Sequence, residues 1–323
     1  MQRRYGRFGA KLGTGISALL AAIAVCGPLT AAEPQPVAQT PATAAKPAAA
    51  KADEPAKPIV WETDYGTAMR RAEAEKKYLF IVFESAGTAG LVKQVVAETA
   101  KPNSSKDVEH HVFCRLPANV EIAVNGRSTR LLGHSSFSEM QGGPGIAILD
   151  LANPNTEHFR RVVNQLPFAS GKYYRFSPAY VGTALSLPAG TLTQRSMIYA
   201  VRIHPEAPRS TYGDHNAVLR DEANSHSQYQ AAIRNQGHHQ WGSRFQRIAG
   251  RLAQFTGRGS ALREVVAESW PNQGLMDSCV DCVASWRQSS GHWGAVSAPH
   301  NAYAYDIRQG SNGIWYATGL FSE

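Results

Sequence analysis

The first half of the chain alternates apolar runs with stretches of helix-forming residues. Residues 78–83 (Tyr-Leu-Phe-Ile-Val-Phe) form a continuous apolar run bounded by charged residues, which is typical of a strand buried on both faces. The same signal returns at Val112-Phe113 and at residues 145–150, and residues 68–77, before the first run, are good helix formers. Strands that alternate with helices predict an α/β layer over residues 58–168.

The last third of the chain carries helical patterns and then strand patterns. Residues 196–204 and 217–235 have apolar residues at roughly helical spacing. Residues 302–307 and 315–321 alternate in polarity and are rich in aromatic residues, as expected of strands. Ser311-Asn312-Gly313 supplies a turn between them, so we expect the chain to close with a β-hairpin.

The start of the chain lacks both patterns. Four basic residues open it, namely Arg3, Arg4, Arg7 and Lys11. An apolar stretch over residues 16–25 and small residues up to Ala32 follow, which is the order of a secretory signal at residues 1–32. The apolar stretch is shorter than the ~20 residues that span a bilayer, so we expect no transmembrane segment in the mature chain. Export then places the protein in the periplasm, on the cell envelope or outside the cell.

Length and composition divide the remainder of the chain. Residues 33–57 are mostly Ala, Pro, Lys, Gln and Thr, a composition that predicts a disordered linker. At 323 residues the chain exceeds what one core usually supports, so we expect two domains, at residues 58–168 and 191–323. Residues 169–190, which are rich in Tyr, Ser, Pro and Gly, are expected to form a linker packed on one of the domains.

The net charge of the chain belongs partly to the expected signal. The whole sequence has 33 basic and 25 acidic residues, a net charge of +8, and removal of residues 1–32 leaves 29 minus 25, or +4. No dense Lys/Arg stripe interleaved with aromatic residues occurs in the remainder. The sequence therefore lacks the electrostatic footprint of a nucleic-acid-binding protein.

Two histidines and one carboxylate in the last third are the main candidates for chemistry. His238, with His239 beside it, Glu264 and His292 lie in three separate segments. Neutral imidazole and carboxylate are well suited to hold a divalent ion or a polar ligand, so their convergence would form a functional cleft. The alternative is a purely structural hydrogen-bonded network made by the same side chains.

Cysteine usage is consistent with export. Cys279 and Cys282 form a C-x-x-C pair within a helical pattern, and in an exported protein we expect them to form a short disulfide. A structural zinc site would need two further ligands. Cys114 falls in an apolar strand pattern, and we expect it to be a small buried hydrophobic residue rather than a catalyst.

Residues 58–168 resemble the thioredoxin-like family of secreted proteins. The match lies in residues 61–65 (Trp-Glu-Thr-Asp-Tyr), the helix after them, the strand that ends at Phe83, and Gly143-Pro144 before a strand, where that family places a cis-proline. The family has a C-x-x-C pair after its first long strand, but here residues 87–90 read Gly-Thr-Ala-Gly. Dithiol exchange needs an attacking thiolate and a resolving partner, so we expect a redox-inactive scaffold or a module that binds a protein partner.

Residues 191–323 resemble the CAP superfamily of cysteine-rich secretory, antigen 5 and pathogenesis-related-1 proteins, particularly its bacterial SCP-like form. Residues 237–245 (Gly-His-His-Gln-Trp-Gly-Ser-Arg-Phe) look like the first histidine segment of the family, in which an aromatic residue lies three positions and an arginine six positions beyond the histidine. Residues 263–267 (Arg-Glu-Val-Val-Ala) are similar to the G-E-N-[IV]-A segment. Residues 286–292 (Trp-Arg-Gln-Ser-Ser-Gly-His) are close to W-x-x-S-P-G-H.

This resemblance implies an α-β-α sandwich with a cleft lined by His238, Glu264 and His292. His238 fits the family's spacing better than His239, and Glu268 is the nearby competitor of Glu264. Several family members bind a divalent metal in the cleft, and many bind sterols or other lipids. Three protein ligands would suit a weak site for zinc, calcium or magnesium, with water in the open positions.

The function that the resemblance implies is that of an exported binding protein for a metal ion, a lipid or a small molecule derived from the cell wall. The alternative is a metal-assisted hydrolase that uses the same cleft. In that case an ion held by His238 and His292 would polarise water, and Glu264 would act as the base.

Overall fold

Two β-sheets with helices on their faces form the part of the chain that this computed structural model describes. The described residues are 59–101, 105–124, 126–256 and 261–323. The expected signal at residues 1–32 and the expected linker at residues 33–57 lie outside them. No helix in the described ranges is both long enough and apolar enough to cross a membrane.

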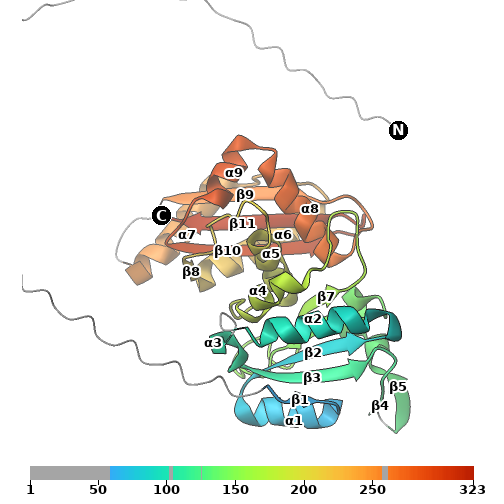
Figure 1. Cartoon of the computed structure of the whole chain (residues 1–323). Helices are drawn as coiled ribbons and strands as arrows, with labels where there is room; N and C mark the ends of the chain where they lie inside the picture. The colour runs from blue at the N-terminus through green and yellow to red at the C-terminus, as the bar shows by residue number, and fades with distance from the viewer. Residues whose placement is uncertain (1–58, 102–104, 125, 257–260) are drawn as a thin grey trace, which may run out of the picture. The chain divides into compact units, whose positions relative to one another are not determined.

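The first sheet has five strands in the order β1-β3-β2-β6-β7 (Figure 1). They are β1 (Trp61–Glu62), β2 (Tyr78–Glu84), β3 (His111–Pro117), β6 (Gly145–Leu149) and β7 (Val162–Pro167). β1 and β2 are parallel to β3, whereas β6 runs antiparallel to β2 and β7 antiparallel to β6. The three strands expected from apolar runs are present. The apolar pattern does not predict β7, because Asn164 and Gln165 interrupt it.

Helices cover both faces of this sheet. α1 (Tyr65–Glu75) begins where the Asp64 carboxylate accepts a hydrogen bond from the Thr67 backbone N–H at 2.7 Å. It packs against the odd-numbered residues of β2, from Leu79 to Phe83, while α2 (Ala89–Thr99) packs in the cluster that holds the even-numbered ones. Burial on both faces explains why the apolar run in β2 is continuous.

Smaller elements complete this half of the chain. They are α3 (Ser105–Val108), the hairpin of β4 (Glu121–Val124) and β5 (Arg127–Arg130), and the 3-10 segments η1 (Ala86–Thr88), η3 (Leu131–Gly133) and η4 (Ser135–Met140). None of the peptide bonds in the described ranges is cis. Gly143-Pro144 therefore does not form the cis-proline that the thioredoxin-like resemblance implies.

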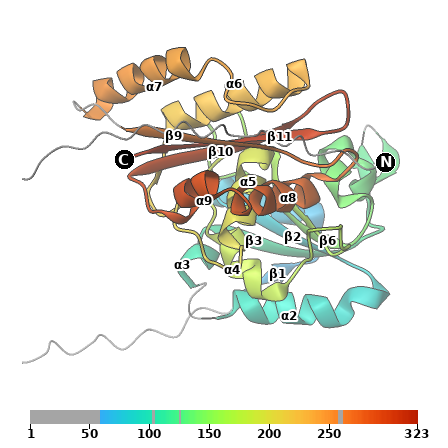
Figure 2. The same ribbon diagram turned by 90° about the horizontal axis from the view of Figure 1, so that it is seen from above.

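The second sheet has four strands in the order β8-β10-β11-β9. They are β8 (Asp214–His215), β9 (Leu262–Glu268), β10 (Ala302–Gln309) and β11 (Trp315–Ser322). One face carries α6 (Ala217–Ile233) and α7 (Trp241–Thr256), and the other carries α5 (Leu192–Arg202), α8 (Leu275–Arg287) and α9 (Ser290–Ser297) (Figure 2). This half therefore has three layers, with the sheet between two layers of helices.

The closing hairpin is present as β10 and β11, which pair antiparallel along their whole length. Gly313 in the turn has φ of +74°, a left-handed conformation that glycine adopts without strain. Along β10, Tyr303 and Tyr305 pack in the cluster with α5 and α8, whereas Ala304 packs with α6 and α7. The alternation seen in the sequence thus separates the two helical layers.

One hydrophobic cluster extends through both halves. It joins Phe80 of the first sheet to Met197 of α5 and Tyr305 of the second sheet. The expected linker takes part in it, because residues 169–190 contain η5 (Pro178–Tyr180) and α4 (Val181–Leu185), and α4 is largely buried. This segment is folded into the core and is more than a spacer.

A fully buried arginine also joins the two halves. Arg195 on α5 donates from Nε to Asn164 Oδ1 on β7 at 2.6 Å, and from Nη1 to the carbonyls of Leu187 and Pro188 at 3.0 and 2.8 Å. Its guanidinium lies 5.0 Å from the ring centroid of Tyr78 on β2. Burial lowers the pKa of Arg195 to about 10, so the side chain remains charged at neutral pH.

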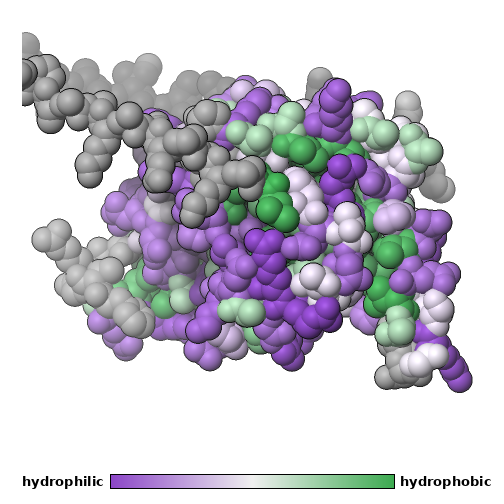
Figure 3. All heavy atoms as spheres, turned by 60° about the horizontal axis from the view of Figure 1, so that its bottom comes forward, coloured by the Kyte–Doolittle hydropathy of each residue, from purple (hydrophilic) through white to green (hydrophobic). Residues whose placement is uncertain are grey.

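The face of the molecule in Figure 3 is mainly hydrophilic, with apolar atoms in limited patches. Among the described residues, a few large apolar side chains remain exposed: Val60, Tyr212, Tyr229, Ile233 and Trp270. Most of the large apolar side chains in these ranges are therefore used in the core.

Candidate functional site

A pocket of about 530 Å³ lies beside β9 and the N-terminal ends of α7 and α9. Its lining combines polar and apolar side chains, among them His238, Trp241, Leu262, Glu264, Ser289, His292 and Ala295. The structure thus brings together three of the residues singled out in the sequence, although they lie 26 and 28 positions apart along the chain.

Glu264 is the centre of the polar network behind this pocket. It pairs in register with Leu320 of β11, so it lies on the sheet face covered by α6 and α7, and its side chain is 1% exposed. Oε1 accepts a hydrogen bond from His238 Nδ1 at 3.0 Å. Oε2 accepts one from Arg244 Nη2. Both carboxylate oxygens are therefore engaged by neighbouring side chains.

These contacts determine the ionisation of Glu264. Burial by itself would raise the pKa of this carboxyl. The hydrogen bonds from His238 and Arg244 and the charge of Arg244 outweigh burial, and they hold the pKa below its ordinary value. Glu264 is thus a fixed anion at neutral pH that holds His238 and Arg244 in place.

His226 on α6 is a part of the network that the sequence interpretation missed. Its side chain is 1% exposed, its Nε2 donates to the Gly237 carbonyl at 3.0 Å, and the same nitrogen lies 3.8 Å from Glu264 Oε1. Burial lowers the pKa of His226 to about 4, so the imidazole is neutral. One signal in the sequence points to it: His226 lies on the helix face that buries Leu219 and Ala223.

His238 and His292 face one another at the pocket. Their ring centroids are 5.7 Å apart with an interplanar angle of 38°, and the His238 side chain is 45% exposed. Burial, followed by the neighbouring His238, lowers the pKa of His292 below its ordinary value. Because Glu264 binds Nδ1 of His238, the Nε2 atom of that ring remains available to a ligand.

His239 has a different place from the one expected. It is not among the residues that line this pocket. Its Nε2 donates to the Asn235 carbonyl at 3.2 Å, and its ring lies 5.6 Å from Tyr229 and 6.1 Å from His226. The family spacing that favours His238 over His239 agrees with this geometry.

This pocket offers a metal ion two imidazoles, those of His238 and His292, rather than the three expected ligands. In the described part of the chain, no group of three His, Cys, Asp or Glu side chains is placed to hold an ion. Zinc–nitrogen bonds of about 2.0–2.1 Å at a tetrahedral angle put two ring centroids roughly 5 Å apart. The separation of 5.7 Å between His238 and His292 is close to this value. These two residues would suit a weakly held ion, with Glu264 supporting His238 from behind.

The structure does not contain the expected disulfide. Cys279 and Cys282 are free thiols, both buried within the regular helix α8. Burial raises the pKa of each thiol well above its ordinary value. Both side chains serve as small hydrophobic groups in the core cluster.

Residues 87–90, where the thioredoxin-like resemblance would place a redox pair, contain no cysteine. They span the end of η1 and the first turn of α2, and Gly87 and Gly90 face open space. Cys114 is on β3, fully buried, and burial raises its pKa to about 12. At neutral pH this thiol is protonated and therefore a poor nucleophile.

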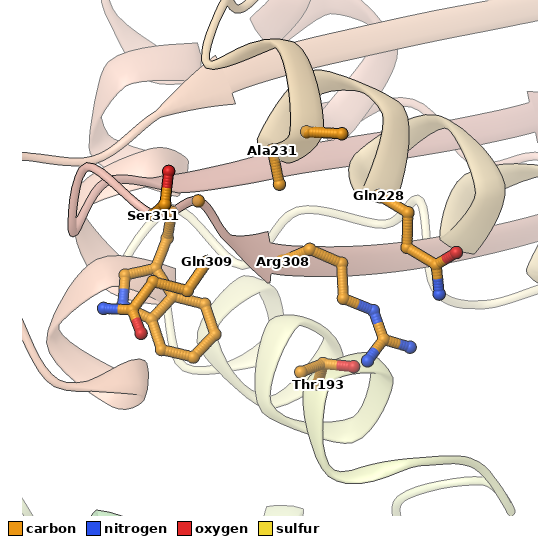
Figure 4. Close-up of a pocket in the computed structure, with 9 residues that line it drawn as sticks. Thr193, Gln228, Ala231, Arg308, Gln309 and Ser311 are labelled. Carbon is orange, nitrogen blue, oxygen red and sulfur yellow. The ribbon is translucent and has the colours of Figure 1, made fainter.

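A second pocket, of about 520 Å³, lies between α5, α6 and the turn after β10 (Figure 4). Arg308 points into it toward Thr193. The Nη2 atom of this guanidinium has local acceptors, because it donates to Asn224 Oδ1 at 3.0 Å and lies 3.4 Å from Asp306 Oδ2, whereas Nε is buried without a hydrogen-bond partner. Asp306 is fully buried, so Arg308 serves to stabilise it.

The described fold belongs to the α/β class, since helices flank both sheets. Comparison of the chain with protein-family models, curated proteins and solved structures finds no match.

Proposed function

We propose that the chain is an exported binding protein with a C-terminal domain of the CAP type, whose ligand lies against His238 and His292. Two observations support this proposal. The three motifs of the resemblance meet at one pocket, and the sheet of this half lies between two layers of helices, as in an α-β-α sandwich.

The observation that carries the proposal is the double engagement of Glu264. A general base needs a lone pair aimed at a water or a substrate proton. Both oxygens of Glu264 instead accept hydrogen bonds from His238 and Arg244, and the side chain is almost fully buried. This arrangement favours a binding site, in which Glu264 orients His238, over the metal-assisted hydrolase.

The pocket suits a small ligand with an apolar body and a polar end. Its volume of about 530 Å³ lies within the usual range of small-molecule sites. Trp241, Leu262 and Ala295 offer apolar surface, and the two imidazoles offer polar contacts. A lipid or a wall-derived molecule has this chemistry, and a divalent ion bound by both histidines would add a charge for its polar end.

The first half is proposed to be a redox-inactive thioredoxin-like module that supports the second half or binds a protein partner. The order and directions of its five strands and the helices on both faces support this. The glycine-rich corner at residues 87–90 and the buried Cys114 argue against dithiol exchange.

A direct test compares three single substitutions in the mature chain. Calorimetric titration with zinc, calcium and magnesium, together with binding of a fluorescent fatty acid, measures the affinity of the wild type. His238→Ala and His292→Ala should each weaken the observed binding at least about tenfold, because each removes one of two polar contacts. His239→Ala is the matched control and should leave binding unchanged. An equal loss in His239→Ala, or no binding of any probe by the wild type, would exclude this pocket as the site.

A further inference from the structure

A third pocket, of about 430 Å³, lies where β8 and Tyr303 of β10 meet the C-terminal ends of α5 and α4. Two arginines line it from different elements: Arg202 ends α5, and Arg220 lies in the first turns of α6. His215 of β8 also lines it and stacks on Tyr303, with ring centroids 5.4 Å apart. None of these residues belongs to the histidine pocket.

The partners of both guanidiniums in the described structure are neutral oxygen atoms. Arg202 donates to the Ser186 carbonyl at 3.1 Å, to Thr211 Oγ1 at 3.2 Å and to the Tyr303 hydroxyl at 3.4 Å. Arg220 reaches the Ala189 carbonyl at 3.5 Å. The pocket in Figure 4 differs in this respect, because its arginine lies against a buried carboxylate.

Two polar atoms in this third pocket are buried and have no hydrogen-bond partner: Arg220 Nε and His215 Nε2. Leaving a buried donor or acceptor unsatisfied is unfavourable, so each such atom needs an explanation, and a bound ligand or water is one. The lining includes one acidic side chain, Asp214, which is exposed at the rim and accepts a hydrogen bond from Asn216 Nδ2 at 3.3 Å. Counted over the lining residues, two positive charges and one negative charge give a net charge of +1; Asp107, outside the lining, also interacts electrostatically with Arg202.

His215 gives this pocket an acceptor beside its donors. Burial lowers the pKa of His215 to about 3, so the imidazole is neutral at physiological pH. Its other ring nitrogen hydrogen-bonds to the Ala189 backbone, which leaves Nε2 with a free lone pair. The site therefore offers cationic N–H donors and one acceptor for a hydroxyl hydrogen.

We infer that this pocket binds a hydrogen phosphate group, with Arg202 and Arg220 facing its oxygens and His215 Nε2 accepting its hydroxyl hydrogen. Planar guanidinium groups are well suited to phosphate oxygens. A phosphate that keeps one proton satisfies both kinds of atom in the pocket, whereas a fully ionised oxyanion has no hydrogen to donate to His215. The group belongs to free phosphate, or to a small phosphate monoester in its singly ionised form, which is common only near and below about pH 6.

The first experiment uses the wild-type mature chain and needs no variant. Calorimetric titration near neutral pH with inorganic phosphate and with sulfate compares two anions of similar size and shape, of which only phosphate keeps a proton. Phosphate should bind at least about tenfold more tightly, the factor that one hydrogen bond to a charged group supplies. No phosphate binding at millimolar concentration, or equal affinity for the two anions, would overturn the proposal. Glycerol 3-phosphate is titrated in parallel as a phosphate monoester. Whichever of the two, glycerol 3-phosphate or inorganic phosphate, binds more tightly identifies the source of the phosphate group.

Substitutions then locate the binding. Arg220→Gln should weaken phosphate binding at least about tenfold, whereas Arg209→Gln, at an exposed position outside the pocket, should not change it. His215→Phe keeps a ring against Tyr303 but removes the acceptor, so phosphate and sulfate should then bind with similar affinity. Phosphate binding that survives Arg220→Gln, or selectivity that survives His215→Phe, would place the anion elsewhere. The outcome does not depend on the histidine pocket, so either proposal can fail alone.

Discussion

Asp150–His158 in the first half and Glu264–His238 in the second half are the same kind of pair in different settings. In both, a carboxylate with almost no exposure hydrogen-bonds to Nδ1 of a histidine. The His158 side chain is 5% exposed, whereas that of His238 is 45% exposed. Because a ligand has to reach the imidazole, only the second pair is placed to serve a binding site.

The other hydrogen bonds of the two carboxylates also differ, because one set involves the backbone and the other a side chain. Asp150 also accepts hydrogen bonds from the backbone N–H groups of Ala152 at 2.9 Å and Asn153 at 3.0 Å, so it anchors the chain that follows β6. Glu264 accepts its second bond from the Arg244 side chain on α7. One acid fixes a loop and the other positions side chains, so burial of a carboxylate does not by itself identify a functional site.

Asp150→Ala should have the largest effect on stability, because it removes the carboxylate of the Asp150–His158 pair. The substitution leaves a buried imidazole and two backbone N–H groups without their acceptor, so we expect a loss of about 3 kcal/mol in the free energy of unfolding. Urea unfolding followed by tryptophan fluorescence measures it. Glu157→Ala, at an exposed carboxylate nearby, is the control and should change stability by less than about 0.5 kcal/mol. A loss below about 1 kcal/mol for Asp150→Ala would contradict this account.

The pH dependence of stability tests the surroundings of the second pair, through the neighbouring His226. The folded-state pKa of His226 is about 4, against an ordinary value of 6.5. Its contribution to stability is therefore fully present above pH 6.5. It is lost as pH falls toward 4, because the unfolded chain binds a proton that the folded chain does not.

His226→Gln removes this titration. The fall in the free energy of unfolding between pH 6.5 and 4 should then be smaller by roughly 2–3 kcal/mol. Urea unfolding at a series of pH values measures the slope, and His110→Gln, at an exposed position, is the control that should keep it. An unchanged slope in His226→Gln would mean that the imidazole is protonated as easily in the folded chain as in the unfolded one.

The two histidines of the pocket should differ modestly in stability. His238→Ala leaves Oε1 of the buried Glu264 without its closest donor, so we expect a loss of about 1 kcal/mol. The described ring contact of His292 is with His238, and His292→Ala should cost less than about 0.5 kcal/mol. Thermal melts of both variants test this order. A larger loss in His292→Ala would indicate that His292 has a structural role.

The smallest effect expected is the absence of thiol chemistry. Cys114, Cys279 and Cys282 are buried and free, so a thiol reagent should not react with the native mature chain and should titrate three thiols once the chain is unfolded. Insulin reduction should not occur. A single thiol after unfolding would show that Cys279 and Cys282 form the disulfide expected from the sequence.

The sequence predicts those parts of the fold in which the burial of each residue follows from the periodicity of its own strand or helix. The apolar run in β2 predicts burial on both faces, and the alternation in β10 and β11 separates two helical layers. The sequence pattern of residues 169–190 does not predict that this segment is part of the core. The burial of its residues, such as Tyr174 and Val181, depends on elements far away along the chain.

The candidate site divides along the same line. The resemblance to the CAP superfamily predicts that His238, Glu264 and His292 share a pocket, which their spacing along the chain alone does not establish. The helix face of His226 indicates that it is buried, but its part in the network depends on a contact between α6 and β9, which lie far apart along the chain. The hydrogen bonds to both oxygens of Glu264, on which the proposal of a binding site rests, are likewise seen only in the structure.

Arg195 has a consequence for how the chain unfolds. If the two halves separated, a guanidinium that is now fully buried would lose Asn164, and a broken apolar surface would be exposed on each side. Removing one partner of a buried polar contact involving a charge is strongly unfavourable. The two sheets are therefore expected to melt in one cooperative transition, and residues 58–168 expressed alone would lack part of their own core.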